Sequence, residues 1–211
     1  QADFVVGNPP FIGASTMRSA LGDGYVDALR GAWQDVPESS DFVMYWWQHA
    51  AALARNGGLR RFGLITTNSI RQTFNRRVIQ THLSDAKKPL SLSFVIPDHP
   101  WVDSADGAAV RIAMTVGVAG ATPGALVQVM RETAAGDEVD VALVQKAGMI
   151  HADLRIGANV AAARALRANA GISSPGLKLH GAGFIVMPDV ATKFEEDAPV
   201  RPYRNGRDLT D

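Results

Sequence analysis

The stretch Asp3-Phe4-Val5-Val6-Gly7-Asn8-Pro9-Pro10-Phe11 decides how this chain is interpreted. Its first part is apolar and rich in strand-forming residues, so it predicts a buried strand. The strand should end in a turn, because Asn favours turns and Pro has no backbone N–H for a sheet ladder. We refer to Asn8-Pro9-Pro10-Phe11 as the tetrapeptide.

The tetrapeptide carries groups that suit the methylation of an exocyclic amine. Such a nitrogen is a poor nucleophile because its lone pair is delocalised, so a site must accept hydrogen bonds as positive charge develops on it. The Asn8 side-chain oxygen and the Pro9 carbonyl are two acceptors, and neither proline has an N–H to repel the amine. Pro10 stiffens the turn, and Phe11 offers a face on which a flipped base can stack. A turn without any catalytic role is the alternative.

Predicted strands and helices alternate through residue 118. Strands are predicted at residues 3–7, 62–68, 91–96 and 108–118; helices at 25–33 within a loop of residues 12–38, from Ser39 or Ser40 to Arg55, and from Asn68 or Ser69 to Leu83. Trp46 and Trp47 are expected in the core, and Asn56-Gly57-Gly58 should end the helix that reaches Arg55. The alternation predicts an α/β fold with a largely parallel sheet, whose last two strands form a hairpin at an antiparallel edge.

The composition changes after residue 118. Short strands are predicted at 126–131 and 139–144, an alanine-rich helix at 157–169, a loop at 171–183 and a strand at 184–187. A boundary near residues 145–155 divides the chain into domains at 1–148 and 149–211.

Charge is balanced overall but not locally. The chain has 21 basic and 21 acidic residues, so it lacks the global footprint of a nucleic-acid binder. Residues 60–88, however, hold seven basic residues and one acidic residue, a local excess of six positive charges. Within it Arg71, Arg76 and Arg77 are candidates for contacts with DNA phosphates, with a solvated helix face as the alternative. Further candidates near the end of the chain are Arg201, Arg204 and Arg207.

Several site classes are disfavoured. The absence of cysteine excludes disulfides and thiolate metal ligands, which fits an intracellular protein. The five histidines lack metal-ligand spacing, so no metal is expected. No apolar run approaches the roughly 20 residues of a membrane helix.

Residues 3–11 resemble the fourth sequence motif of adenine-N6 DNA methyltransferases that depend on S-adenosylmethionine. The segment from 56 to 69 resembles the next part of that family, and His99-Pro100-Trp101 with residues 109–114 resembles its eighth motif. More loosely, residues 177–187 and 202–209 are similar to the target-recognition region of type IIG or IIL restriction–modification enzymes and related phage-defence methylases. The resemblance implies that the tetrapeptide is catalytic, that Asn8 lies beside the bound methyl donor, and that Phe11 and Trp101 sandwich the extruded base. For Trp101 an ordinary packing role is the alternative.

The sequence departs from that family in one respect. The family's glycine loop for S-adenosylmethionine and its acidic ribose ligand precede the tetrapeptide, and neither is present in this chain. We therefore expect the second half of a Rossmann-like methyltransferase sheet followed by the start of a target-recognition domain. The donor-binding half, and any nuclease, would lie upstream in the same polypeptide, and the piece alone would be inactive.

The predicted function is methylation of adenine N6 in double-stranded DNA, in the bacterial cytoplasm, within restriction–modification or phage defence. One alternative is a glutamine N5-methyltransferase acting on release factors, because an amide nitrogen poses the same delocalisation problem. Another is a non-catalytic module for DNA specificity.

Overall fold

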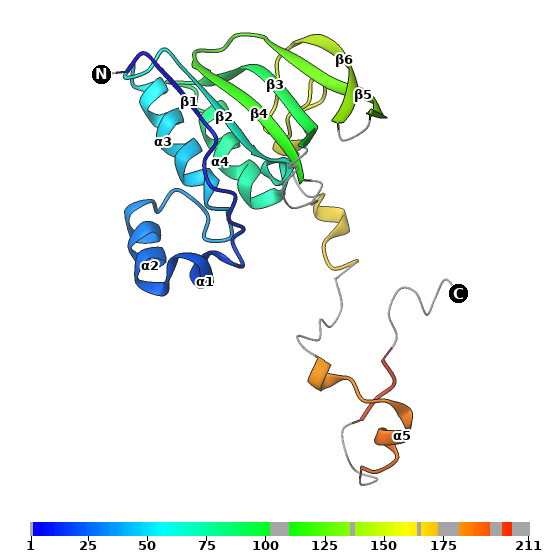
Figure 1. The fold of residues 1–211 in the computed structure, drawn as a ribbon. Helices are drawn as coiled ribbons and strands as arrows, with labels where there is room; N and C mark the ends of the chain where they lie inside the picture. Colours follow the sequence, from blue (N-terminus) through cyan, green and yellow to red (C-terminus); the bar gives the residue numbers. More distant parts are fainter. Residues whose placement is uncertain are drawn as a thin grey trace. The chain divides into compact units, whose positions relative to one another are not determined.

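The predicted first strand is present as β1, Phe4–Gly7, in a computed structural model of the chain. The prediction that it is buried was wrong for this chain, because Phe4 and Val6 are exposed. The structure describes residues 2–101, 110–135, 138–163, 166–172, 182–194 and 200–203. Within these ranges β1 belongs to a six-stranded sheet with the order β1-β2-β4-β3-β5-β6 (Figure 1). The other strands are β2 (Arg61–Thr67), β3 (Leu90–Trp101), β4 (Val110–Ala119), β5 (Gly124–Ala135) and β6 (Glu138–Gly148).

The α/β class is confirmed, but the sheet is more mixed than the sequence predicted. β1 is parallel to β2, and β3 is parallel to β5. The predicted hairpin of β3 and β4 is confirmed, yet it lies inside the sheet instead of at its edge, because β4 also pairs antiparallel with β2. The hairpin turns β4 back into the place between β2 and β3, and this leaves the far side of β3 free to pair with β5. β5 and β6 form a second antiparallel pair, longer than the two short strands predicted there.

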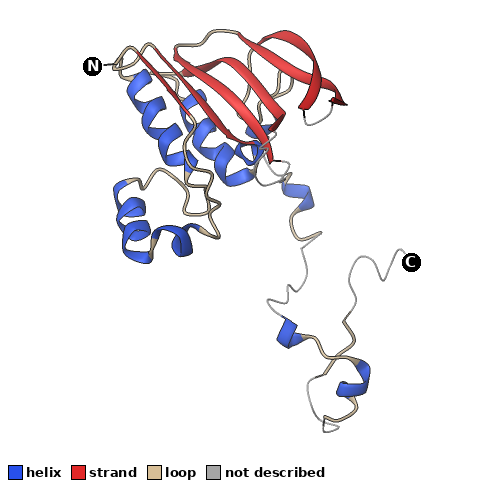
Figure 2. Cartoon of the chain, in the orientation of Figure 1, coloured by secondary structure: helices blue, strands red, loops and turns tan. Residues whose placement is uncertain are grey.

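Helices cover one face of this sheet. α3 (Val43–Arg55) and α4 (Thr73–Leu83) lie side by side against it, as Figure 2 shows. Two shorter helices, α1 (Met17–Leu21) and α2 (Asp23–Ala32), occupy the segment predicted as a long loop. α2 confirms the short helix expected there, whereas α1 was not predicted. Met17, Val26 and Val36 are buried, so this segment packs into the core cluster.

Both helix starts were predicted wrongly. α3 begins at Val43, after Ser39 and Ser40, and no side chain caps it. α4 begins at Thr73, because Asn68–Arg71 form a separate 3-10 turn, η1. The polar side chains expected as caps of α4 are engaged in tertiary hydrogen bonds instead. The helix end at Arg55 is confirmed, and Gly57 has the left-handed φ of 77° that glycine permits.

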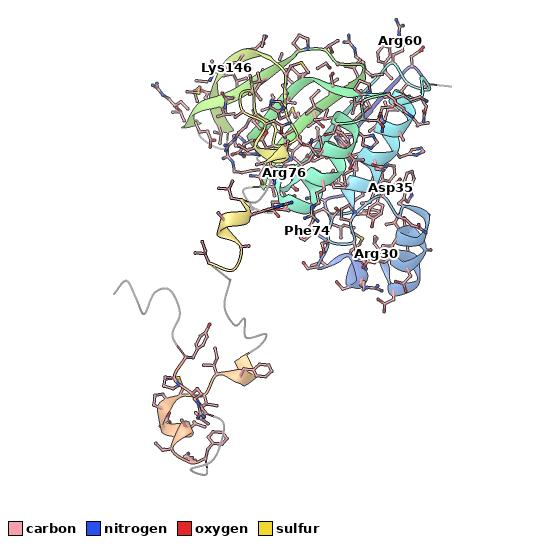
Figure 3. The ribbon with its side chains drawn as sticks, turned by 180° about the vertical axis from the view of Figure 1, so that it is seen from behind. Arg30, Asp35, Arg60, Phe74, Arg76 and Lys146 are labelled. Atoms are coloured by element: carbon pink, nitrogen blue, oxygen red, sulfur yellow. The ribbon has the colours of Figure 1, made fainter. Side chains whose placement is uncertain are left out.

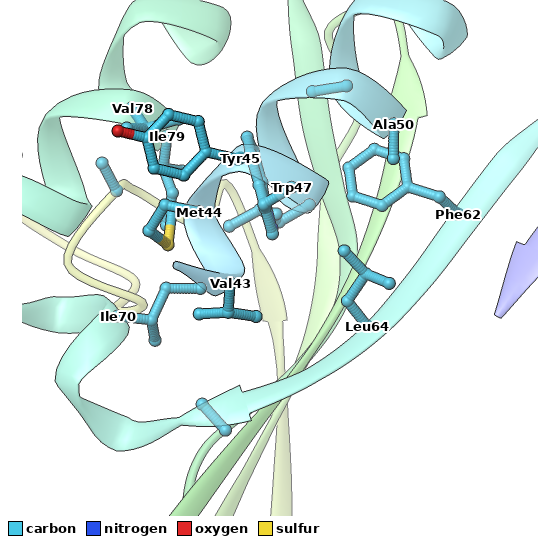
Figure 4. Close-up of a cluster of buried hydrophobic side chains, with 14 of the residues drawn as sticks. Val43, Met44, Tyr45, Trp47, Ala50, Phe62, Leu64, Ile70, Val78 and Ile79 are labelled. Atoms are coloured by element: carbon cyan, nitrogen blue, oxygen red, sulfur yellow. The ribbon is translucent and has the colours of Figure 1, made fainter. Parts of the chain in front are cut away.

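The core lies between the sheet and α3 (Figure 4). Trp47 is fully buried, meets the Phe62 ring edge-on at 5.4 Å and donates from Nε1 to Thr115 Oγ1 at 3.2 Å. The expectation that Trp46 is also buried was wrong, since 52% of it is exposed. Successive residues on a helix point about 100° apart, so a helix lying on a sheet buries only one of two adjacent rings. Phe74 in α4 is also exposed.

A buried histidine joins α3 to α4. His82 is 2% exposed; its Nε2 lies 2.6 Å from Gln48 Oε1, and its Nδ1 lies 3.0 Å from Arg55 Nη1. Burial and then the nearby Arg55 charge lower the pKa of His82 from 6.5 to about 4. Asp85 binds the other side of the Arg55 guanidinium. The histidine is therefore a neutral structural link at physiological pH.

The secondary structure predicted near the end of the chain was wrong in two places. Ile150, Ala152 and Leu154 are buried in the core cluster, and the chain divides into compact units at 1–163 and 164–211. The alanine-rich helix was wrong: the described residues of that segment form only the short 3-10 turns Val160–Ala162 and Arg167–Asn169. The strand predicted at 184–187 was also wrong, because a 3-10 turn, Ala182–Phe184, precedes an irregular segment and α5, Pro188–Ala191. Most of the predicted loop at 171–183 lies outside the described residues. No helix in the described ranges is long and apolar enough to cross a membrane.

Candidate functional site

The carboxyl ends of three strands, β1, β2 and β3, lie together at one end of the sheet, which we call its carboxyl edge. β1 runs parallel to β2, and β3 runs in the same direction because β4 is antiparallel to both β2 and β3. In the register, Thr67 and His99 both pair with Ile112, so the ends of β2 and β3 lie at the same level. The tetrapeptide follows β1, η1 follows β2, and Trp101 is the last residue of β3. Ligands of open α/β sheets bind at this edge.

The tetrapeptide is anchored by one proline and exposes the Asn8 side chain and part of the Phe11 ring. Pro9 is buried, whereas Asn8 and Pro10 are exposed and Phe11 is 38% exposed. Among the described residues, neither the Asn8 side chain nor the Pro9 carbonyl forms a hydrogen bond. Ile12 N donates to Pro10 O at 3.2 Å, which closes the turn. The Asn8 amide and part of the Phe11 ring are therefore accessible at the end of β1, and the Pro9 carbonyl has no hydrogen-bond partner among the described residues.

A polar network that the sequence did not reveal holds the loop after the tetrapeptide. Asp41 Oδ1 accepts from Ala14 N at 3.1 Å, and Asp41 Oδ2 accepts from Ser69 Oγ and Asn75 Nδ2, both at 2.7 Å. Asp41 N donates to Asn75 Oδ1 at 2.8 Å. The only sequence signal was an acidic residue just before an apolar helix, which is typical of a helix cap.

Trp101 stands at the end of β3, next to a second network. It pairs with Val110 in the register and is 37% exposed. Asp98 accepts from Arg111 Nε at 2.5 Å and from Asn68 Nδ2 at 3.3 Å. Arg111 also binds both carboxylate oxygens of Glu132. These hydrogen bonds raise the pKa of Arg111 and lower that of Glu132. These hydrogen bonds thus hold in place the hairpin that carries the Trp101 ring. Residues 102–109 lie outside the described ranges.

The basic stretch of residues 60–88 does not form one patch. Arg60 stacks over Phe4 near the start of β2, and Figure 3 shows it far from Arg76. Arg71 ends η1, while Arg76 and Arg77 lie in the first half of α4, so these three are near the carboxyl end of β2. None of them forms an ion pair with another described residue. Arg201 is exposed, and Arg204 and Arg207 lie outside the described residues.

A cavity in the described part of the chain lies elsewhere. It measures about 260 Å³ and is lined by the end of α4, the start of β3 and residues 149–152. No predicted site residue lines it. The described residues contain no group of three or more His, Asp or Glu side chains that could hold a metal ion.

The family described as MmeI, DNA-methyltransferase domain, matches residues 1–128. The chain belongs to this family. Among solved structures, the type IIL restriction–modification enzyme MmeI in complex with DNA has a TM-score of 0.55 and 20% identity, over 74% of this chain and 20% of that one. A type I restriction–modification methyltransferase subunit from Streptococcus thermophilus has a TM-score of 0.38 and 12% identity, over 65% of this chain and 28% of that one. A search of curated proteins finds no match.

Membership of the MmeI methyltransferase-domain family confirms the sequence-based resemblance to restriction–modification methyltransferases. The likeness to MmeI itself, at 20% identity, confirms the fold of the sheet. This chain spans a fifth of the length of MmeI, since the match covers 20% of that protein. The family match includes the tetrapeptide, η1, α4 and Trp101.

Proposed function

We propose that this chain is the catalytic second half of a DNA methyltransferase that transfers a methyl group from S-adenosylmethionine to adenine N6. One observation carries the proposal: at the carboxyl end of β1, buried Pro9 anchors a turn that presents the Asn8 amide and the Pro9 carbonyl without other partners among the described residues. A family match over residues 1–128 supports the same chemistry.

The tetrapeptide would act by positioning the amine. Asn8 Oδ1 and Pro9 O accept hydrogen bonds from the two N6 hydrogens, and these bonds direct the nitrogen lone pair away from the ring. Asn8 and Pro9 would hold the amine in line with the donor methyl group, so that the C–N bond could form as the C–S bond breaks, without a covalent enzyme intermediate. The neutral thioether would leave, and one N6 proton would pass to water. Fixed acceptors of this kind contribute about 3 kcal/mol each in other enzymes. Correct positioning supplies most of the remaining rate enhancement.

S-adenosylmethionine, when bound, supplies an electrophilic methyl group on a positively charged sulfur. The exposed Asn8 amide fits the methyl end of this donor, because its oxygen is an acceptor that stabilises nearby positive charge. We place the residues for its adenosine and ribose in the upstream half of the polypeptide. The chain described here therefore contributes the side of the site that holds the amine.

Double-stranded DNA is the proposed substrate, with the target base flipped out of the helix. Phe11 and Trp101, both more than a third exposed at the same sheet edge, are the proposed stacking rings. Arg71, Arg76 and Arg77 are the proposed phosphate contacts. The structure of MmeI in complex with DNA supports DNA as the partner. We place the reaction in the bacterial cytoplasm, as part of restriction–modification or phage defence.

The uncovered side of β1 supports an upstream half. In the described part of the chain β1 pairs with β2 alone, and its side chains Phe4 and Val6 are 59% and 87% exposed. A short apolar strand exposed in this way needs a partner, because unpaired strand edges invite association. We propose that strands and helices N-terminal to this chain complete the sheet there.

Residues 149–211 are proposed to begin the target-recognition domain, after a catalytic part at 1–148. The end of the family match at residue 128 supports this order of domains. The packing of Ile150, Ala152 and Leu154 into the core cluster favours a short linking segment that remains attached to the catalytic part.

The test is methyl transfer by the protein at its full encoded length. Tritium from labelled S-adenosylmethionine should appear in duplex DNA and not in a release factor. Asn8→Ala should lower kcat about 10²- to 10³-fold. Asn56→Ala serves as the matched control, because Asn56 is exposed after α3, where it accepts from Lys88 Nζ. Labelling of the release factor alone would favour glutamine methylation, and DNA binding and methylation that are both unaffected by Asn8→Ala would remove the catalytic assignment.

A further inference from the structure

Asp41 connects three parts of the molecule that meet beside the tetrapeptide. Its carboxylate accepts hydrogen bonds from the loop at Ala14, from η1 at Ser69 and from α4 at Asn75, at 3.1, 2.7 and 2.7 Å. Its neighbour Phe42 donates from N to Ile12 O at 2.9 Å. The loop that leaves the tetrapeptide is thus fastened at two residues to the start of α3.

The partners of Asp41 are themselves fixed. Asn75 is 3% exposed, and its amide also donates to Ser69 O at 3.0 Å while its Oδ1 accepts from Asp41 N. Ser69 Oγ lies 2.5 Å from Thr67 Oγ1 at the end of β2. A carboxylate that accepts three hydrogen bonds uses most of its capacity, so it holds a single orientation.

η1 forms hydrogen bonds with both sides of the proposed site. Ser69 binds Asp41, and the preceding residue, Asn68, donates to Asp98 on the strand that ends in Trp101. Asp98 in turn binds Arg111 across the β3–β4 hairpin. The loop that carries Phe11 and the hairpin that carries Trp101 are therefore both tied to the same four-residue turn.

We propose that Asp41 is a positioning residue, which sets the tetrapeptide at a fixed place relative to η1 and hence relative to Trp101. This inference rests on the proposed methyl transfer. Asp41 acts through the Ala14 and Ile12 backbone and touches no reacting group. Loss of its carboxylate should free the loop at residues 12–16 and misplace the amine acceptors, and misplacement by about 1 Å is costly to a reaction that depends on alignment.

The test compares Asp41→Ala and Asp41→Asn with Asp85→Ala in the protein at its full encoded length. Asp85 is a matched control, because its carboxylate also accepts from backbone N–H groups, those of Lys87 and Lys88, but at the opposite end of α4. Asp41→Ala should lower kcat at least tenfold and leave the KM for S-adenosylmethionine within twofold. Asp41→Asn should lose less, because its Oδ1 can still accept from Ala14 N. Asp85→Ala should leave both constants unchanged.

Hydrogen exchange measured by mass spectrometry separates this inference from the proposed function. In Asp41→Ala, and more weakly in Ser69→Ala, exchange should accelerate at least fivefold in peptides covering residues 12–16 and remain unchanged in β5 and β6. A normal kcat in Asp41→Ala, or acceleration spread equally over the sheet, would overturn the positioning role. If the unmodified protein methylates nothing, the proposed function fails. The exchange measurement still tests Asp41 in that case, because unaltered exchange at residues 12–16 in Asp41→Ala would show that Asp41 does not hold the loop.

Discussion

The buried His82 predicts how the stability of this chain depends on pH. Its pKa is lowered from 6.5 to about 4 in the folded state, first by burial and then by the charge of Arg55. The unfolded chain therefore binds a proton at a higher pH than the folded chain does. The stability linked to this residue is complete above pH 6.5 and is lost as the pH falls towards 4.

The size of the effect follows from the two pKa values. At pH 5 the unfolded histidine is almost fully protonated and the folded one is mostly neutral, which lowers the free energy of unfolding by about 2 kcal/mol relative to pH 8. At pH 3 the loss approaches about 3 kcal/mol. Asp85 does not confuse a measurement at pH 5, because hydrogen bonds from the backbone of Lys88 and Lys87 hold its pKa below 3.8.

The assay is urea denaturation of the chain at pH 8 and pH 5, followed by far-ultraviolet circular dichroism. The comparison variant is His82→Gln, because an amide can still bond to Gln48 and Arg55 but does not titrate. The unmodified chain should lose about 2 kcal/mol more than the variant between the two pH values. The other histidines are present in both proteins and cancel. Equal losses, within about 0.5 kcal/mol, would refute the assignment of His82 as a buried neutral link.

Two further predictions concern packing and DNA binding. Gly117→Ala should lower the free energy of unfolding by about 1–3 kcal/mol, because a Cβ there would lie 2.3 Å from the Phe62 ring. Gly63→Ala is the control and should lower the free energy of unfolding less, because the nearest atom to its Cβ would be 3.6 Å away. Thermal or urea denaturation measures both. In the full-length protein, Arg76→Ala should reduce the slope of log affinity for DNA against log salt by about 1, whereas Arg60→Ala should not. Equal slopes for all three proteins in a salt titration would remove Arg76 from the DNA interface.

Local pattern was sufficient where a residue's own chemistry decided its conformation. The apolar run before Asn8 predicted β1, and the two prolines predicted its end, because proline cannot continue a sheet ladder. Gly57 predicted the end of α3, because glycine adopts a positive φ without a steric penalty. The tetrapeptide and its acceptors follow from covalent structure in the same way. For this reason the family could be inferred before any contact was known.

The sequence pattern predicted wrongly where the burial or hydrogen bonding of a side chain depended on residues far away in the chain. Trp46 and Trp47 are adjacent and equally apolar, and only the position of α3 on the sheet buries the second and exposes the first. Ser69 has the composition of a helix cap, yet its hydroxyl binds Asp41, which is 28 residues away in the chain. A sequence window contains the candidates for such contacts but not the distances between them.

The sequence by itself determined the chemistry at the end of β1: two oxygen acceptors and an aromatic ring on a turn that proline makes rigid. Tertiary structure alone decided what surrounds that turn. The insertion of β4 between β2 and β3 places Trp101 at the tetrapeptide's edge of the sheet, and Asp41 ties the loop to η1. The physical reason is the distance along the chain over which each interaction acts. Turn and strand preferences arise within a few residues, whereas strand order and a shared carboxylate depend on chain segments that meet only after folding.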